Sequence, residues 1–176
     1  GTTHNTFSVA DFTRHYFGLT GPAVAVSSAC SSSAKVFSSA RRMMAAGLID
    51  AAVVGGVDSL CLTTLYGFNS LGLISDQACR PFDAQRNGIS IGEAAAFALL
   101  ERAPDHLDAD AVLLLGVGES SDAYHMSSPH PEGLGARMAM QDALNRAGLQ
   151  PAEIDYINLH GTATPSNDAA EGKAVH

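Results

Sequence analysis

The sequence predicts an α/β fold. Its 176 residues are enough for one ordinary domain, and 46% of them are hydrophobic whereas 16% are charged, so a buried core is expected. Apolar runs without alternation are typical of strands that are covered on both faces, and stretches with helical spacing separate these runs. The succession of strand, helix and strand over residues 23–57 has the length of a βαβ unit.

The N-terminal part of the chain supplies the first elements of this fold. Aromatic and branched side chains at near-helical spacing predict a helix over residues 7–18. The run AVAVSSA, residues 23–29, predicts a buried strand, and residues 31–46 predict a helix that Gly47 ends. The run DAAVVGGVDSL, residues 50–60, predicts a second buried strand with a glycine exit. We expect these strands to pair with strands outside the chain, because their apolar edges are otherwise exposed.

The rest of the chain continues the alternation. Residues 63–93 are polar and punctuated by glycine, which predicts loops near a site. The further predicted elements are strands over residues 94–101, within 109–125 and over 154–159, and helices over 133–149 and from 169 to the end.

Charge and composition exclude several classes of function. The formal net charge of -8 argues against nucleic acid or an anionic membrane surface as the main partner. No apolar run is long enough for a membrane span and no signal peptide opens the chain, so a cytoplasmic location is expected. The three cysteines lack metal-ligand spacing, so thiols without a metal are expected. The stretches GVGES and VVGGV lack the spacing of a dinucleotide site, and no cofactor is predicted.

A cysteine stands where the predicted strand turns into the predicted helix. Cys30 is flanked by serine and alanine, and the first N–H groups of the helix point toward that position unsatisfied. They favour the thiolate and can stabilise an oxyanion after attack on a carbonyl, as in a nucleophile elbow. A free cysteine in such a turn is also common as a small packing residue, and position alone leaves both interpretations open.

His160 is the histidine best placed to serve such a nucleophile. It ends the predicted strand 154–159, and sites in open α/β sheets collect at the carboxyl ends of strands. Cys61 and Cys79 stand at no predicted helix start, so packing roles are expected for them. The stretch RPFDAQRNG, residues 80–88, is expected to form a structural loop held by Arg–Asp pairs.

Four stretches together resemble the β-ketoacyl-acyl carrier protein synthases. They are VSSACSSSAKVFSSARRMMAAGLIDAAVVGGVD, RPFDAQRNGISIGEAAAFALLE, SSDAYHMSSP and LHGTATPSNDAAE, and they occur in the family's order. The sequence is most similar to the elongating condensing enzymes of type II fatty acid synthesis. This resemblance implies a thiolase-like fold, layered α-β-α-β-α in the whole enzyme, of which the chain is an incomplete slice.

The resemblance implies a decarboxylative Claisen condensation. A malonyl-carrier thioester reacts with an acyl group that Cys30 holds as a thioester. His160, the histidine of the HGTAT stretch, is implied to stabilise the enolate or to activate the malonyl group. The other implied roles are pantetheine contact by Thr162 and Thr164, lining of the acyl pocket by Phe68, and ordering of the site by Asp168 and Glu171.

The resemblance also implies binding partners for the enzyme and a limit to the activity of this chain by itself. An acyl carrier protein is the expected partner and the full-length enzyme is expected to be a homodimer, with no nucleic acid, membrane or metal involved. The family's second catalytic histidine and its GFGG loop do not occur in the sequence. Residues 1–176 are therefore predicted to form a partial ketosynthase domain, from the end of the N-terminal half to the start of the C-terminal half. No condensing activity is expected of these residues by themselves.

Three alternatives stay open beside the fatty acid synthase. A polyketide or aryl-polyene-type ketosynthase shares the cysteine turn, and so does a thiolase, although HGTATPSND favours condensing enzymes that use carrier proteins. A non-catalytic partner subunit of a ketosynthase is the third, and Cys30 argues against it because such partners usually lose the thiol.

Overall fold

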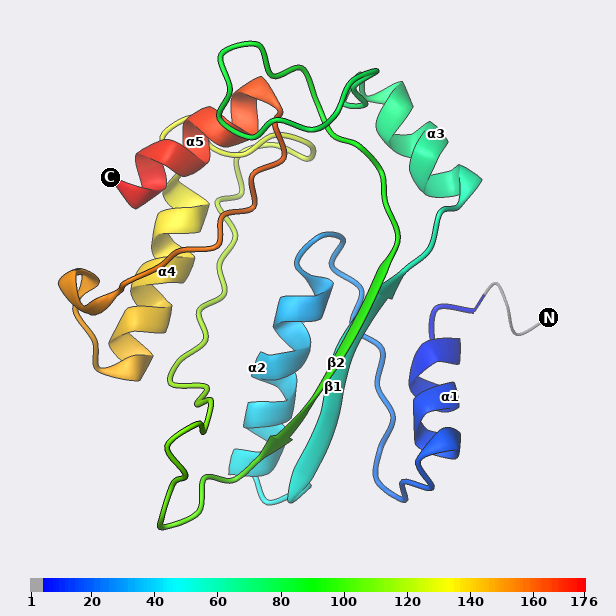
Figure 1. Ribbon diagram of the computed structural model, residues 1–176, viewed down its shortest axis with the longest axis vertical. Coiled ribbons are helices and arrows are strands. Elements are labelled where there is room, and N and C mark those ends of the chain that lie inside the picture. Colours follow the sequence, from blue (N-terminus) through cyan, green and yellow to red (C-terminus); the bar gives the residue numbers. More distant parts are fainter. Residues whose placement is uncertain (1–4) are drawn as a thin grey trace. The chain divides into compact units, whose positions relative to one another are not determined.

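The computed structural model describes residues 5–176 as two compact units with both helices and strands. Among the described residues, one unit comprises 5–59 together with 93–112, and the other comprises 60–92 and 113–176. Figure 1 labels the elements of each. The mixed α/β class predicted from the sequence is confirmed. None of the described helices is long and apolar enough to cross a membrane.

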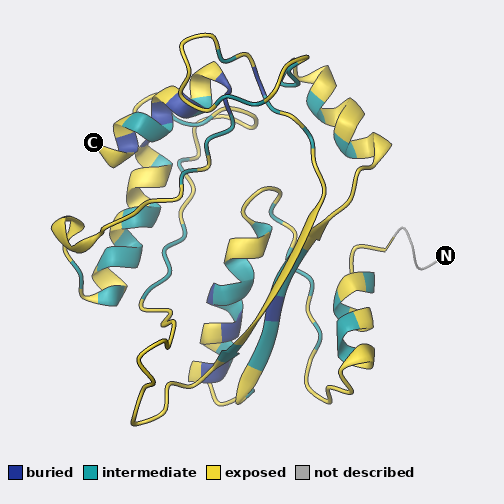
Figure 2. Cartoon of the chain, viewed as in Figure 1, coloured by how far each residue is buried: buried dark blue, intermediate teal, exposed yellow. Residues whose placement is uncertain are grey.

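The first unit is a two-stranded sheet with helices. Its elements are α1 (Ser8–Tyr16), α2 (Ser32–Ala45), β1 (Ala51–Asp58) and β2 (Ala94–Glu101). The strands pair antiparallel, with Ala51 opposite Glu101 and Asp58 opposite Ala94. Helix α2 packs on β1 (Figure 1). The buried residues of this unit lie on these two elements (Figure 2).

The glycine pair of β1 explains how closely its neighbours approach. A Cβ atom on Gly56 would lie 2.7 Å from Cβ of Ser33 on α2, and one on Gly55 would lie within 3.0 Å of the Phe97 ring on β2. Real Cβ atoms do not approach so closely, so glycine is required for this packing. Of the glycines that were interpreted as a strand exit, Gly56 therefore allows the start of α2 to pack on the sheet, and Gly55 makes room for the Phe97 ring of β2.

The run 23–29, which was expected to pair with a strand outside the chain, forms no ladder strand within residues 5–176, so the βαβ unit predicted over residues 23–57 does not form there. Within residues 5–176 this stretch has no ladder partner beyond one bridge between Ser28 and Cys30. Strand β1 instead pairs antiparallel with β2. Apolar runs predict extended backbone, but a strand needs a hydrogen-bonding neighbour that the run itself does not specify.

The second unit consists of helices joined by long segments without regular structure. It contains α3 (Leu62–Ser70), α4 (Leu134–Ala147), a 3₁₀ turn (Pro151–Glu153) and α5 (Pro165–Val175). Helix α4 contacts α5. The prediction that residues 63–93 are entirely loop is wrong at its start, because α3 forms there. Two β-branched residues and Gly67 lower the helix propensity of α3, which is why the polar pattern hid it.

Two further predicted strands, in 109–125 and over 154–159, are extended segments without ladders among the described residues. The first packs on α4 through glycine. Cβ atoms on Gly116 and Gly118 would lie within 3.0 Å of α4 backbone atoms of Ala143 and Ala139. The glycines of the GVGES stretch, which lacks the spacing of a dinucleotide site, thus allow this extended segment to lie close against α4.

Helix α5 begins earlier than the sequence analysis predicted. It starts at Pro165 with Thr164 as the N-cap residue, not at residue 169. Proline suits the first helical position because its missing N–H has no intrahelical partner there. The earlier start places Asp168 in the first turn of the helix.

Candidate functional site

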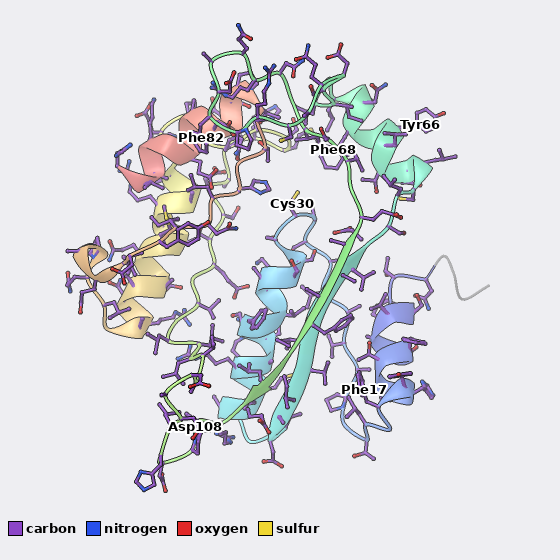
Figure 3. All side chains as sticks on the ribbon, in the orientation of Figure 1. Phe17, Cys30, Tyr66, Phe68, Phe82 and Asp108 are labelled. Atoms are coloured by element: carbon purple, nitrogen blue, oxygen red, sulfur yellow. The ribbon has the colours of Figure 1, made fainter. Side chains whose placement is uncertain are left out.

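Cys30 lies at the turn that enters α2 (Figure 3). Its side chain is an exposed thiol, and α2 begins at Ser32. The residue before it, Ala29, has φ 52°, a left-handed backbone that L-residues other than Gly, Asn and Asp rarely adopt. Such a sharp turn exposes the side chain that follows it, as in a nucleophile elbow.

The serines around Cys30 lock this turn by hydrogen bonds. Ser31 Oγ donates to the carbonyl of Ser28 at 2.9 Å, and Ser32 Oγ donates to the carbonyl of Ala29 at 2.6 Å. The N–H of Ser28 donates to Ser32 Oγ at 2.8 Å. Ser31, the N-cap residue of α2, makes no side-chain capping bond. Its hydroxyl is turned back into the loop, and the N–H of Ser32 donates to the carbonyl of Ala29 at 3.1 Å. The N–H groups that a capping side chain would bond, at the second and third helical positions, can therefore face a charged or polarised ligand atom.

The other predicted site residues all belong to the second unit. Phe68 is half-buried on α3, and its carbonyl accepts the N–H groups of Leu71 and Leu73. The remaining five lie together at the segment 160–164 and the start of α5: His160, Thr162, Thr164, Asp168 and Glu171.

Glu171 fixes the backbone that carries His160. Its Oε1 accepts the N–H of His160 at 2.6 Å, and its Oε2 accepts the N–H of Gly161 at 2.9 Å. Gly161 has φ 53°, a conformation that glycine adopts without strain. Two charge-assisted bonds to successive amides set the direction in which the chain leaves His160. His160 itself is exposed.

Asp168 is the most deeply buried charged side chain of this region, with its residue 2% exposed. Its Oδ1 accepts the N–H of Ala163 at 3.2 Å and its Oδ2 accepts the N–H of Phe82 at 2.7 Å. Ala163 and Phe82 have φ 59° and 61°, so both are non-glycine residues in the left-handed region. One carboxylate thus holds two strained backbone positions from segments far apart in the sequence.

The two threonines of the HGTAT stretch contact each other. Thr162 Oγ1 and Thr164 Oγ1 lie 2.8 Å apart, and Thr164 is buried. The thiol of Cys79 donates to the carbonyl of Thr162 at 3.6 Å. Cys79 therefore has a packing and hydrogen-bonding place in the structure, in agreement with the role expected for it.

A small cavity opens beside His160. Its volume is about 140 Å³, and its polar lining consists of His160, Asn167, Glu171 and Asp122. Asp122 accepts the N–H of His130 at 2.8 Å and the N–H of Tyr124 at 3.1 Å. These N–H groups, that of His130 foremost, lower the pKa of Asp122 below its ordinary value, because they stabilise the charged carboxylate.

Sequence reasoning missed several residues that build this region. Arg86 was expected to pair within its own loop, but its partner is Asp168, at 3.4 Å from Nε. No local pattern signals a pair so far apart in sequence. Asp122 had a detectable signal, because an aspartate in a Ser/Asp-rich loop commonly accepts backbone N–H groups nearby.

Two domains of one protein family match nearly the whole chain. The N-terminal domain of the β-ketoacyl synthases matches residues 2–106 and their C-terminal domain matches residues 111–176. The 3-oxoacyl-[acyl-carrier-protein] synthase 2 of Vibrio cholerae is 37% identical over 169 residues, which are 90% of this chain and 41% of that protein.

Two solved structures are also similar. The complex of the ketosynthase ApeO with its chain length factor ApeC from Xenorhabdus doucetiae matches with 47% identity and a TM-score of 0.92, over 98% of this chain and 42% of the matched chain. The complex AntDE:AntF, a type II PKS acyl-carrier protein with its ketosynthase, matches with 25% identity and a TM-score of 0.86, over 97% of this chain and 44% of the other.

The fold is that of thiolase-like condensing enzymes, as the motifs predicted. The chain belongs to the β-ketoacyl synthase family. It spans about 40% of the length of the curated relatives it matches.

Proposed function

We propose that this chain is the part of a β-ketoacyl-acyl carrier protein synthase that carries the acyl-accepting cysteine and one catalytic histidine. The reaction is a decarboxylative Claisen condensation in fatty acid biosynthesis, and the enzyme is an acyltransferase. Residues 1–176 form a partial ketosynthase domain. The observation that carries the proposal is Cys30, an exposed thiol after a left-handed residue at the entrance to α2, in a chain that belongs to this family.

The first half-reaction takes place on Cys30. The thiolate attacks the carbonyl carbon of an acyl-carrier thioester, and a new sulfur–carbon bond forms. The bond between that carbon and the carrier's sulfur breaks, and the carrier leaves as a thiolate that takes a proton from solvent. The amide groups at the start of α2 stabilise the oxyanion that forms in between. The dipole of α2 also favours the thiolate over the thiol.

The second half-reaction uses the segment around His160. A malonyl-carrier thioester loses carbon dioxide, and His160 donates a hydrogen bond to the enolate oxygen that results. The enolate carbon attacks the acyl group, a carbon–carbon bond forms, and the Cys30 sulfur leaves as a thiolate. Glu171 holds the backbone of His160, Thr162 and Thr164 contact the pantetheine arm, and Phe68 lines the acyl pocket.

The proposed partners follow from the same reaction. The substrates arrive on an acyl carrier protein. We propose separately, from the resemblance to the family, that the whole enzyme is a homodimer in the cytoplasm. Relatives named as synthases that act on acyl carrier protein substrates support this partner, and so does the structure of a ketosynthase with its carrier protein.

A second candidate is a ketosynthase that works with a chain length factor in polyketide-type synthesis. The similarity to the ApeO–ApeC complex, at 47% identity, favours it. The two candidates share Cys30 and differ in the partner. Size-exclusion chromatography with light scattering, followed by a condensation assay on the purified species, separates them. A homodimer that condenses without another subunit supports the first candidate, and activity that requires a second type of subunit supports the second.

Mass spectrometry after incubation with an acyl-carrier thioester tests the proposal. The sample is a protein that carries this segment at the length of its relatives. We expect one acyl adduct on the peptide with Cys30 and none in Cys30→Ala. The matched controls are Cys61→Ala and Cys79→Ala, which keep the adduct. Acylation of the other thiols while Cys30 stays unmodified contradicts the proposal.

A further inference from the structure

Two segments far apart in sequence meet at one buried carboxylate in the second unit. Asp168, at the start of α5, accepts the N–H of Phe82 from the loop 79–88 and the N–H of Ala163 from the HGTAT stretch. Both donors are left-handed non-glycine residues, a conformation that costs about 1–3 kcal/mol and persists only where the surroundings hold it. Asp168 supplies that constraint to both segments at once.

Arg86 supplies the countercharge from the same loop. Its Nε lies 3.4 Å from Asp168 Oδ2, with side chains 22% and 1% exposed, in an ion pair that lacks hydrogen-bond geometry. Its Nη2 donates to the carbonyl of Pro165 at 3.2 Å, and its Nη1 donates to the carbonyl of Asp83 at 3.0 Å. One guanidinium therefore joins its own loop to the first residue of α5 and to the buried carboxylate.

The arrangement acts directly on the threonine pair. Ala163 stands between Thr162 and Thr164, whose hydroxyl oxygens lie 2.8 Å apart. Its left-handed backbone reverses the chain between them, so the two side chains emerge on the same side of the segment. We call the contacts that join the loop 79–88, the HGTAT stretch and the start of α5 the junction. Cys79 adds to it, since its thiol donates to the carbonyl of Thr162.

We propose that Arg86 is a positioning residue for the two threonine hydroxyls, acting through Asp168 and the left-handed Ala163. The inference deepens the proposed function, because it rests on the threonines contacting the pantetheine arm of the carrier substrates. Arg86 itself touches no substrate. Without it, Asp168 keeps its N–H donors from Phe82, Ala163 and Asn167 but has no cation beside it. The loop 79–88 then also loses its bond to the carbonyl of Pro165 at the start of α5.

The test compares two arginines of one loop. Arg86→Gln removes the cation beside Asp168, whereas the matched control Arg80→Gln removes an equal charge whose hydrogen bonds, to Gln77 and to the carbonyl of Gln85, stay within the loop region. Arg86→Lys keeps a cation near Asp168 and is expected to recover part of the loss.

We expect Arg86→Gln to raise the KM for both carrier-bound substrates about 10-fold while kcat changes much less, because the loss is one of binding geometry. The rate at which iodoacetamide alkylates Cys30 stays unchanged, since that reagent needs no pantetheine contact. Arg80→Gln leaves both quantities at their original values. Equal KM values for the two glutamine variants overturn the proposal, and so does a variant in which the alkylation rate changes as much as KM.

Amide hydrogen exchange tests the junction without any reaction. Arg86→Gln is expected to speed exchange at the N–H groups of Phe82 and Ala163 about 10-fold, while Arg80→Gln leaves them protected. Unchanged protection in Arg86→Gln refutes the junction even if the enzyme condenses. Faster exchange at these two amides, in a protein whose Cys30 is never acylated, retains the junction and refutes the proposed function.

Discussion

Replacing Glu171 by glutamine tests the account of how His160 is held. The carboxylate accepts two backbone N–H groups, from His160 at 2.6 Å and from Gly161 at 2.9 Å, through its two oxygens. Glutamine has one acceptor oxygen, so one N–H keeps a neutral partner and the other faces an NH₂ group, which is itself a donor.

The magnitude follows from these two bonds. A hydrogen bond to a charged group contributes about 1.5–3 kcal/mol and a neutral one about 1 kcal/mol. His160 is exposed, so water replaces part of what its N–H loses, whereas Gly161 is half-buried. We therefore expect Glu171→Gln to lower the free energy of unfolding by about 2 kcal/mol.

Urea unfolding followed by circular dichroism measures this change, with amide exchange at His160 and Gly161 as the local readout. The matched control is Glu153→Gln. Glu153 accepts one exposed N–H, from Gln150 at 2.8 Å, and glutamine retains an oxygen for it, so the expected loss is about 0.5 kcal/mol. If the two variants unfold at the same urea concentration with unchanged exchange at both amides, the reasoning about Glu171 is refuted.

Three further outcomes are expected. Ala29→Gly is expected to keep the free energy of unfolding or to raise it by up to about 1 kcal/mol, because glycine relieves the left-handed strain. The control Ala10→Gly inside α1 is expected to lower it by about 1 kcal/mol. A large loss of stability in Ala29→Gly contradicts the strained turn. Gly118→Ala is expected to lower the free energy of unfolding by about 1–3 kcal/mol, because the new Cβ collides with α4. Gly67 has open space around it in α3, so the control Gly67→Ala is expected to raise the free energy of unfolding. Equal melting temperatures of the two variants contradict the close packing of Gly118 on α4. The lowered pKa of Asp122 makes the charged form stabilising, so this contribution is present above the ordinary value of 3.8 and is lost as the pH falls through the lowered pKa. Asp122→Asn is expected to flatten that part of an acid unfolding curve, and an unchanged curve rules the contribution out.

Local sequence was sufficient for features that depend on near neighbours. The helix predicted over residues 31–46 forms as Ser32–Ala45, and the one predicted over 133–149 forms as Leu134–Ala147. Helical spacing and a following glycine express interactions within a few residues, so these signals transfer to any fold. The position of Cys30 at the entrance to a helix and the family are determined in the same way, by residues that are adjacent in the chain.

Strand pairing was beyond local sequence. The run 23–29 and the segment 154–159 are extended as their apolar residues predict, yet they have no ladder among the described residues. Strand β1 pairs with β2, which begins 36 positions after β1 ends (94 − 58). A side-chain pattern shows that a segment is suited to a sheet, but its hydrogen-bonding neighbour is chosen by the rest of the fold.

The sequence by itself determined the family and the residue types of the candidate site, because the serine-flanked cysteine before a helix and the HGTAT stretch are defined by the local order of residues. Only the tertiary structure decided what holds the second-unit residues in place. Arg86 reaches Asp168 across 82 positions (168 − 86), and Phe82 reaches it across 86. A buried carboxylate needs donors and a countercharge from whichever segments the fold brings to it, and that need leaves no pattern in the neighbouring residues.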